Sequence, residues 1–250
     1  MHKPSRHDLV WLKPAGWARL LTRCPAADAG LLAHWAAACL PLVATRHGAA
    51  AGIEAFALGL PAPLRWAGRR VALAATFDEV DRIGRFPTLL QAIASLPVPV
   101  ARRLDAVAAA LGARAALTRV YGSHGWQVLT GLDCLHAGSD LDLLIPAPSP
   151  AEALLVCSRL ASYHGELRVD GELLLPGGGA VAWREWHEAA PRGLDRVLVK
   201  HVGGAELMPL SVLWTDAADI ARGRSDTLAA SAPPAAAATV GWHARFAVAP

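Results

Sequence analysis

The sequence predicts an α/β (α+β) fold, with a mixed sheet flanked by helices and a smaller α+β domain at the N-terminus. Three observations support this prediction. Residues 117–121 form a short apolar run that ends at a glycine, and residues 139–145 alternate between polar and apolar side chains, as strands do. Residues 167–175 and 180–186 flank the Pro-Gly-Gly-Gly segment 176–179, whose composition is typical of the turn of a hairpin.

The chain divides into three segments by composition. Its 250 residues are enough for one large domain or two small ones, each with a core of its own. We expect an N-terminal α+β domain over residues 1–85, a second domain over residues 86–224 and an Ala/Pro-rich tail over residues 225–250. The low complexity of the last segment predicts a flexible tail.

The N-terminal segment switches between strand and helix patterns. Residues 7–12 alternate as a strand does, and residues 30–39 form a helical pattern. Pro41 ends that helix, because proline lacks the amide hydrogen that a helix interior needs. Further strands are predicted at residues 42–45, 53–58 and 71–76.

The second segment is expected to begin with a linker, residues 86–104, that contains a short helix broken at Pro97 and Pro99. An alanine-rich helix over residues 105–116 then leads to the apolar strand. Pro150 suits the first turn of the next helix, where a missing amide hydrogen costs nothing. The remaining predicted elements are that helix over 150–163, the hairpin, a strand over 196–202 and a closing helix over 210–221.

Composition and charge limit the possible partners. The net charge of +3 suits an anionic substrate, but no basic cluster interleaved with aromatic residues occurs, so we expect no nucleic acid. The most apolar run, residues 31–44, is too short to span a bilayer. The N-terminus lacks the pattern of a secretory signal, and the four cysteines lack metal-binding spacing. We therefore expect a cytoplasmic protein with reduced thiols and no membrane contact.

Gly122 and Ser123 lie where the apolar strand passes into a helix. We expect the helix to begin at Ser123, whose hydroxyl can cap the free amides of the first turn. Those amides and the helix dipole favour an anion, and Gly122 lets the anion approach the backbone. The sequence therefore predicts a phosphate site here, and an ordinary helix cap is compatible with the same residues.

Two aspartates follow on the next predicted strand. Because side chains alternate along a strand, Asp140 and Asp142 face one way while Leu141 and Leu143 pack on the other side. Two carboxylates this close repel each other, and a hard cation such as Mg²⁺ is the usual reason to keep them together. The alternative interpretation is an aspartate-rich strand end that only caps a turn.

Other catalytic signatures fail at specific positions. A G-x-S-x-G nucleophile elbow around Ser123 would need glycine at position 121, where the chain has Tyr121. The sequence contains no G-x-x-x-x-G-K-[ST] motif and no G-x-G-x-x-G that opens a helix. These absences argue against a serine hydrolase, a P-loop NTPase and a Rossmann-type dinucleotide site.

The Gly-Ser corner followed by Asp-x-Asp resembles the active-site pattern of the polymerase-β-type nucleotidyltransferase superfamily. Further blocks in this order make the chain similar to the phosphoribosyl-dephospho-CoA transferases of malonate decarboxylase, also called holo-acyl-carrier-protein synthases. The resemblance runs from about residue 6 to about residue 215. The blocks that carry it are residues 6–12, 58–61, 119–126, 139–144, 170–173, 183–186 and 197–200.

The resemblance implies a nucleotidyltransferase-type sheet and a set of site residues. It makes Asp140, Asp142 and Asp170 the catalytic residues and the ligands of Mg²⁺ or Mn²⁺. Asp170 would help to position or deprotonate the attacking hydroxyl, with Glu172 and Glu185 as alternatives for this third carboxylate. The segment that begins at Asp170 could instead be only a turn.

The same resemblance makes Gly122, Ser123 and Lys200 the substrate-binding residues. Lys200 would pair with a phosphate, although an exposed charge is an equal alternative. Trp183 and Trp186 are compatible with core positions or with a platform for adenine.

Two basic groups have open interpretations. Arg65, Arg69 and Arg70 could contact a phosphate-rich substrate or an acidic carrier protein, or they could lie in a solvated loop. Arg6 and His7 could be simple surface groups, but the resemblance covers them. Their positions in the fold decide between these interpretations.

The activity that the resemblance implies is transfer of the phosphoribosyl-dephospho-CoA group from 2'-(5''-triphosphoribosyl)-3'-dephospho-CoA to a serine, with release of pyrophosphate. The implied partners are this triphosphoribosyl-dephospho-CoA and the apo acyl carrier protein subunit of malonate decarboxylase. Two alternatives are a nucleotidyltransferase with another hydroxyl acceptor, such as a small molecule, RNA or a different protein, and a non-catalytic nucleotide-binding protein.

Overall fold

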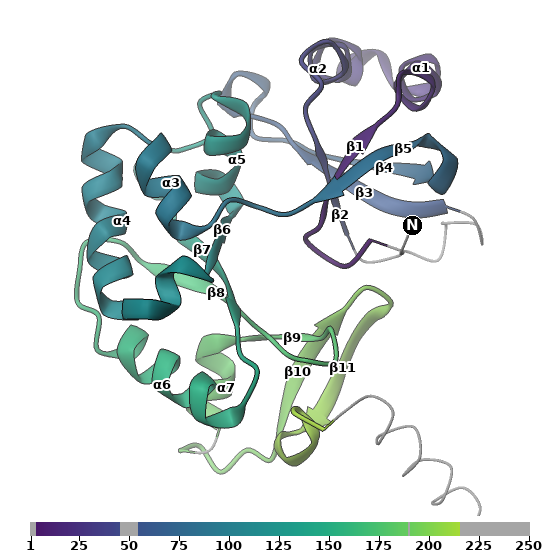
Figure 1. Cartoon of the computed structure of the whole chain (residues 1–250). Helices are drawn as coiled ribbons and strands as arrows, with labels where there is room; N and C mark the ends of the chain where they lie inside the picture. The colour runs from purple at the N-terminus through teal and green to yellow at the C-terminus, as the bar shows by residue number, and fades with distance from the viewer. Residues whose placement is uncertain (1–3, 46–54, 190, 216–250) are drawn as a thin grey trace, which may run out of the picture. The chain divides into compact units, whose positions relative to one another are not determined.

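The computed structural model describes residues 4–45, 55–189 and 191–215 (Figure 1). Contacts group residues 1–214 into one unit and residues 215–250 into a second. The labelled helices and strands of Figure 1 all belong to the first unit. The tail expected over residues 225–250 lies outside the described residues, as does the second half of the closing helix expected over residues 210–221.

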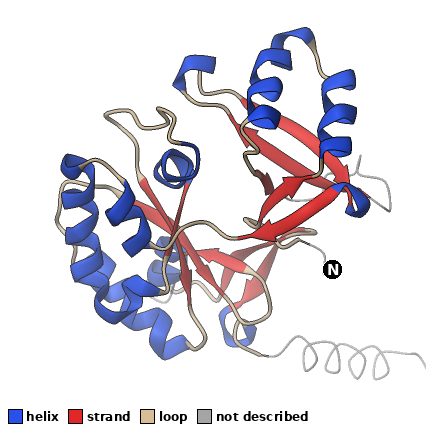
Figure 2. Ribbon diagram, turned by 45° about the horizontal axis from the view of Figure 1, so that its top comes forward, coloured by secondary structure: helices blue, strands red, loops and turns tan. Residues whose placement is uncertain are grey.

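The N-terminal part builds a five-stranded antiparallel sheet in the order β4-β3-β2-β1-β5. β3 alternates between buried and half-buried residues, which gives the sheet an apolar face. Helices α1 and α2 lie on one side of this sheet (Figures 1 and 2), where Trp17 and Trp35 are buried. The elements are β1 (Leu9–Leu12), α1 (Pro14–Arg23), α2 (Ala26–Ala37), β2 (Leu42–Ala44), β3 (Ala55–Pro61), β4 (Arg70–Thr76) and β5 (Val80–Gly84), with 3-10 turns at Leu64–Trp66 and Phe77–Glu79.

The second part builds a six-stranded sheet in the order β11-β10-β9-β8-β7-β6. β7 and β8 run parallel, and the other described strand pairs are antiparallel. Helix α6 (Pro150–Ala161) makes the crossover between β7 and β8 that a parallel pair needs. The strands are β6 (Arg119–Tyr121), β7 (Leu141–Pro146), β8 (Val169–Leu174), β9 (Ala180–Ala182), β10 (Arg196–His201) and β11 (Gly204–Pro209).

The helices of the second part divide between two cores. The six-stranded sheet shares its core with α3 (Leu89–Ser95), α4 (Val98–Leu111), α6 and α7 (Trp183–Ala189). Helix α5 (Gly122–Thr130) instead contributes Trp126 to the core of the N-terminal sheet, as does Phe86 from the connecting segment. The two parts of the first unit therefore share a packed boundary at α5, and this boundary positions the site described below.

The predicted α+β class, with a mixed sheet and flanking helices, is confirmed. The strand predicted over residues 180–186 is wrong beyond Ala182, because α7 begins at Trp183. Four alternating residues fit either element, and tertiary contacts decide here: the Trp183 side chain is buried in the core, and Glu185 accepts a hydrogen bond from the amide of Leu198 at 2.7 Å. The predicted hairpin with its turn at residues 176–179 is confirmed, since β8 and β9 pair as antiparallel neighbours.

The prolines of the predicted linker lie where one helix ends and the next begins: the predicted short helix, α3, ends at Ser95 before Pro97, and a second helix starts directly after that proline. Pro99 lies in the first turn of α4, which begins at Val98 and ends at Leu111, because a missing amide hydrogen is tolerated in a first turn. A 3-10 turn, Gly112–Ala116, replaces the end of the predicted helix over 105–116. A further 3-10 turn, Leu210–Val212, is the described part of the predicted closing helix. Within the described ranges, no helix is long and apolar enough to cross a membrane.

Candidate active site

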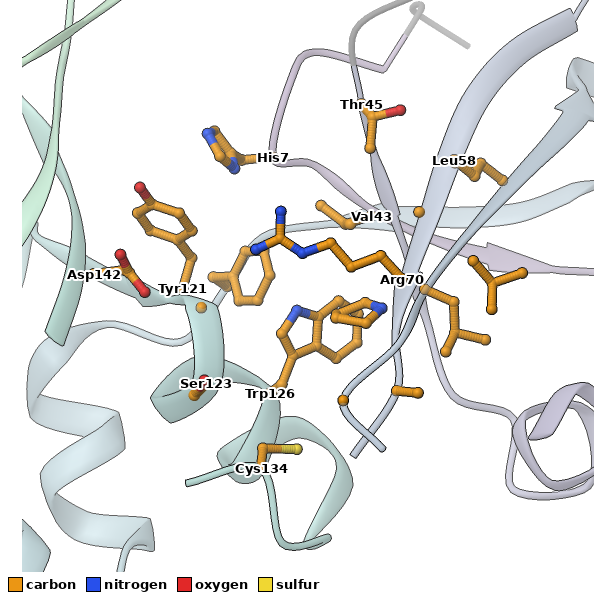
Figure 3. Close-up of a pocket in the computed structure, with 18 of the residues that line it drawn as sticks. His7, Val43, Thr45, Leu58, Arg70, Tyr121, Ser123, Trp126, Cys134 and Asp142 are labelled. Carbon is orange, nitrogen blue, oxygen red and sulfur yellow. The ribbon is translucent and has the colours of Figure 1, made fainter. Parts of the chain in front are cut away.

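A cavity of about 720 Å³ lies where the two parts of the first unit meet. One wall comes from β2, β3 and β4 of the N-terminal sheet, and the opposite wall comes from β6, the start of α5 and Asp142 of β7 (Figure 3). The lining residues that carry charge or hydrogen-bonding groups are Arg6, His7, Thr45, Arg70, Tyr121, Ser123, Trp126, Cys134, His136 and Asp142. The cavity therefore contains part of the predicted site together with N-terminal residues.

Gly122 brings the start of α5 against Asp142. Its φ of +58° is unfavourable for residues with a side chain, and a Cβ at this position would lie 1.9 Å from Oδ2 of Asp142. Only glycine fits both the conformation and the close approach. Tyr121, not Ser123, occupies the N-cap position, so the predicted capping role of the Ser123 hydroxyl is wrong. That hydroxyl lines the cavity and has no hydrogen-bond partner among the described residues.

Asp142 lies on β7, between β6 and β8 of the six-stranded sheet. In the sheet register it lies opposite Tyr121 of β6 on one side and Asp170 of β8 on the other. The neighbouring Leu141 and Leu143 are fully buried, so the predicted alternation along this strand is confirmed. Burial raises the pKa of Asp142 to about 6, and the nearby charge of Asp170 adds to this rise. A cation or another positive group near Asp142 would therefore be favourable.

The other two predicted metal ligands lie outside the cavity lining. Asp140 precedes β7, and its carboxylate lies 3.5 Å from Nη1 of Arg168. Asp170 lies within β8, so the alternative that it forms only a turn is wrong. One of its carboxylate oxygens accepts a hydrogen bond from the amide of Gly171 at 2.8 Å. Gly171 permits the parallel pairing, since a Cβ there would lie 2.2 Å from the carbonyl oxygen of Leu143.

Glu172 is held by two cationic side chains and a histidine. Its carboxylate is 4% exposed and accepts hydrogen bonds from Arg6, from Nε2 of His7 at 3.1 Å and from Nζ of Lys200 at 3.1 Å. Burial alone would raise the pKa of Glu172, but the hydrogen bonds from His7 and Arg6 lower it below its usual range. We call these four residues the Glu172 cluster. Its geometry ties the first described residues of the chain to β8 and β10.

Lys200, Glu172 and Glu185, whose roles the sequence leaves undecided, have hydrogen-bond partners within the protein. Lys200 binds Glu172 and does not belong to the cavity lining. The oxygens of Glu172 accept hydrogen bonds from Arg6, His7 and Lys200. One oxygen of Glu185 accepts the amide of Leu198, as one oxygen of Asp170 accepts that of Gly171, but only Asp170 lies opposite Asp142 in the sheet register. Asp170 is therefore the third carboxylate best placed to act with Asp142.

His7 contributes a strained backbone and a half-buried ring to the cavity. Its φ of +71° is uncommon for a residue with a side chain, and such strain is often kept at functional positions. Its ring lies 4.7 Å from that of Tyr121. Burial lowers the pKa of His7, against the opposing effect of its hydrogen bond to Glu172. The N-terminal block of the sequence resemblance thus supplies part of the cavity wall rather than simple surface groups.

The donor chemistry of the carboxylate edge fits Mg²⁺ or Mn²⁺. Both ions prefer oxygen ligands, and Mg²⁺ is commonly held by one or two carboxylates together with substrate phosphates and water. Asp170 and Asp140, which are predicted to share the ion, both raise the pKa of Asp142, and Glu172 adds a smaller effect. In the part of the chain that the structure describes, no group of three or more His, Cys, Asp or Glu side chains is arranged to hold a metal ion, so Asp140, Asp142 and Asp170 do not form such a site by themselves. Substrate oxygens would have to complete the coordination.

Sequence reasoning missed the aromatic part of the cavity. Trp126 and Phe86 pack edge to face with ring centroids 5.5 Å apart, and both line the cavity. The spacing of Ser123 and Trp126 on α5 places them on one helix face and is the signal that could have identified Trp126.

Comparison with known proteins decides the family. The profile of the phosphoribosyl-dephospho-CoA transferase MdcG N-terminal domain matches residues 5–86, and that of the MdcG C-terminal domain matches residues 88–211. The chain belongs to the phosphoribosyl-dephospho-CoA transferase family. The resemblance inferred from the sequence blocks is confirmed, and membership of this family makes the protein a transferase.

Named relatives of this transferase family match most of the chain. A phosphoribosyl-dephospho-CoA transferase of Xanthomonas euvesicatoria pv. vesicatoria is 38% identical over 213 residues, which are 84% of this chain and 96% of the relative. One from Bradyrhizobium diazoefficiens is 39% identical and covers 80% of this chain and 87% of the relative. One from Pseudomonas putida strain W619 is 34% identical, with 83% and 95% covered. No solved structure is a significant match to the chain.

Proposed function

We propose that the protein transfers the phosphoribosyl-dephospho-CoA group from 2'-(5''-triphosphoribosyl)-3'-dephospho-CoA to a serine of the apo acyl carrier protein of malonate decarboxylase, with release of pyrophosphate. Family membership supports the identity of the transferred group. The observation that carries the chemistry is the close approach of Asp142 to Gly122 at the wall of the cavity. A carboxylate held against the first amides of a helix combines a cation site with a phosphate site.

The reaction needs an attacking hydroxyl, a bound triphosphate and a leaving group. The serine oxygen forms a bond to the α-phosphorus, the bond from that phosphorus to the pyrophosphate oxygen breaks, and the hydroxyl proton is released. The amides at the start of α5 and the hydroxyl of Ser123 donate hydrogen bonds to phosphate oxygens. Asp170 positions the attacking hydroxyl or accepts its proton through the carboxylate oxygen that Gly171 leaves free.

The same proposal includes a divalent cation. Asp140, Asp142 and Asp170 would hold Mg²⁺ or Mn²⁺ together with phosphate oxygens of the substrate. Such an ion would lower the pKa of the attacking hydroxyl and would neutralise charge on the leaving pyrophosphate. The raised pKa of Asp142 supports this role, because a carboxylate that is costly to charge alone is stabilised by a cation.

The intact mass of the apo carrier protein tests the proposal. After incubation with the enzyme, the triphosphoribosyl donor and Mg²⁺, the mass should rise by that of the phosphoribosyl-dephospho-CoA group. Asp142→Asn should reduce the rate at least about 100-fold, because it removes a cation ligand at the reacting phosphate. The matched control is Asp105→Asn, which changes an exposed aspartate of α4 outside the cavity and should leave the rate unchanged.

The outcomes separate the donor from the acceptor. No mass increase, with the donor nevertheless bound, would refute the proposed carrier protein and point to another hydroxyl acceptor. Full activity of Asp142→Asn would refute the assigned site.

A cytoplasmic location belongs to the proposal as well, and the four free cysteines of the described chain agree with a reducing compartment.

A further inference from the structure

Arg70 is an unpaired cation at the edge of the cavity. It is the first residue of β4, and its side chain extends from the N-terminal sheet into the cavity (Figure 3). No described residue forms an ion pair or a hydrogen bond with its guanidinium group. A guanidinium group has five N–H donors in a planar fork that matches the oxygens of a phosphate.

The neighbouring arginines are engaged elsewhere. The Arg65 guanidinium stacks on the ring of Trp66, 3.8 Å from its centroid. Arg69 lies 2.9 Å from a carboxylate oxygen of Asp28 and donates to the carbonyl oxygen of Ala27 at 2.9 Å. The three arginines of this segment therefore have three different environments, and among them Arg70 alone lines the cavity.

The surroundings of Arg70 favour an anionic group of a substrate as its partner, rather than a carboxylate of the protein. On the opposite wall, Asp142 is the carboxylate that lines the cavity, and Arg70 is near enough for its charge to oppose the rise in the pKa of Asp142. Arg6, the other lining arginine, is neutralised by Glu172. The remaining titratable groups of the described lining are His7, Tyr121, Cys134 and His136, none of which supplies a negative charge at neutral pH.

The cavity also has aromatic lining residues. Trp126 and Arg70 both line the cavity (Figure 3), and Phe86 packs against Trp126. Both rings are almost completely buried, whereas the Arg70 side chain is exposed, so its guanidinium group is accessible to a substrate that enters from solvent. A charge-assisted hydrogen bond to an anion is stronger than one between neutral groups.

We propose that Arg70 binds a phosphate group of the donor substrate, so that the N-terminal sheet forms one wall of the donor site. This inference rests on the proposed function and adds a substrate-binding residue to it. The helix start at Gly122 and Ser123 would hold phosphate oxygens from one wall, and the fork of Arg70 would hold them from the other. The donor has two segments that Arg70 could bind: the triphosphate at the reacting end and the diphosphate of its dephospho-CoA part.

Calorimetric titration of the full chain with two probes, inorganic tripolyphosphate and 3'-dephospho-CoA, tests the inference. Arg70→Gln should weaken the binding of at least one probe by about 10- to 100-fold, the value of a charge-assisted phosphate contact. Arg70→Lys should lose less, because an ammonium keeps the charge but not the fork. Arg65→Gln removes an arginine from the same segment but outside the cavity and should bind both probes like the wild type.

Each result has a defined meaning. A loss with tripolyphosphate assigns Arg70 to the triphosphate, and a loss with dephospho-CoA assigns it to the diphosphate. Unchanged binding of both probes by Arg70→Gln, or no binding of either probe by the wild type, would overturn the inference. The unfolding midpoint of Arg70→Gln should equal that of the wild type, since the side chain is exposed and unpaired. These titrations contain no carrier protein, so the inference and the proposed function can fail separately.

Discussion

The two walls of the cavity differ in charge. The wall formed by α5 and the six-stranded sheet carries Asp142, with Asp170 beside it in the sheet register. The N-terminal wall carries Arg6, His7 and Arg70. Neither region alone brings both signs of charge to the cavity. A substrate with phosphate groups and a bound cation needs both, so the N-terminal region is part of the active site in our proposal rather than an appended domain.

The two walls also differ in how their polar residues are held. Asp142 is fixed by strand pairing on both sides and by the glycine corner at the start of α5. Arg6 and His7 are fixed by side-chain bonds to Glu172, which is more than 160 residues away in the chain. Strand pairing is made by the backbone and persists when most side chains are changed. An ion cluster is made by side chains, so the loss of any one member disturbs the positions of the others. Substitution should therefore affect the two walls unequally.

The largest effect is expected from Glu172→Gln. The change leaves Arg6 and Lys200 half-buried without their counter-charge. Removing one partner of a buried ion pair is costly, so the free energy of unfolding should fall by about 3 kcal/mol. Chemical denaturation followed by tryptophan fluorescence measures the change.

A surface pair provides the control for Glu172→Gln. Glu188 and Arg192 form an exposed ion pair with a 2.5 Å separation. Glu188→Gln should cost less than about 0.5 kcal/mol, because water screens an exposed pair. Equal effects of the two substitutions would mean that the Glu172 cluster does not join the two regions.

Gly122→Ala probes the opposite wall. The new Cβ would clash with the Asp142 carboxylate and impose a φ of +58° on alanine. We expect a loss of about 2 kcal/mol in the free energy of unfolding. Transfer activity should fall at least about 100-fold, because Asp142 must move.

The other end of the same helix supplies the control for Gly122→Ala. Gly131 has a φ of +67°, and nothing lies within 4 Å of the position of its Cβ. Gly131→Ala should therefore cost only the backbone strain, about 1 kcal/mol, and keep the activity. If both alanine variants were equally active, the glycine corner would not position Asp142.

Local patterns predicted the carboxylate wall better than the N-terminal wall. The alternation around Asp142 fixed its strand and its face, because both depend on neighbours in the sequence. No local pattern distinguishes Arg70 from Arg65 or Arg69, since their different environments come from tertiary contacts. The three partners of Glu172 could not be predicted for the same reason.

Short segments were also ambiguous in the sequence. The four residues from Trp183 alternate as a strand does but form the start of α7. Proline is typical of a helix break, yet Pro99 lies in the first turn of α4, where its missing amide hydrogen is tolerated. Tertiary contacts decide the first case, and position within the helix decides the second.

A smaller effect than that of the Glu172 cluster is expected from an ion pair inside the N-terminal region. Glu79 accepts hydrogen bonds from Arg19, one of them at 2.7 Å, and these bonds lower the pKa of Glu79 to about 2 from its ordinary 4.5. Because the folded pKa is below the unfolded one, the pair stabilises the protein fully above about pH 4.5, and this contribution is lost as the pH falls toward 2. Arg19 is a third exposed, so the contribution should be only about 1 kcal/mol.

Glu79→Gln measures this contribution directly. At pH 7 the variant should be less stable than the wild type by about 1 kcal/mol, and the difference should shrink as the pH falls from about 4.5 toward 2. The Glu172 cluster is intact in both proteins, so its own titration cancels in the comparison. A difference that stayed constant with pH would show that the Glu79 carboxylate acts through packing rather than charge. A difference as large as that of Glu172→Gln would remove the distinction between ion pairs within one region and those that join the two.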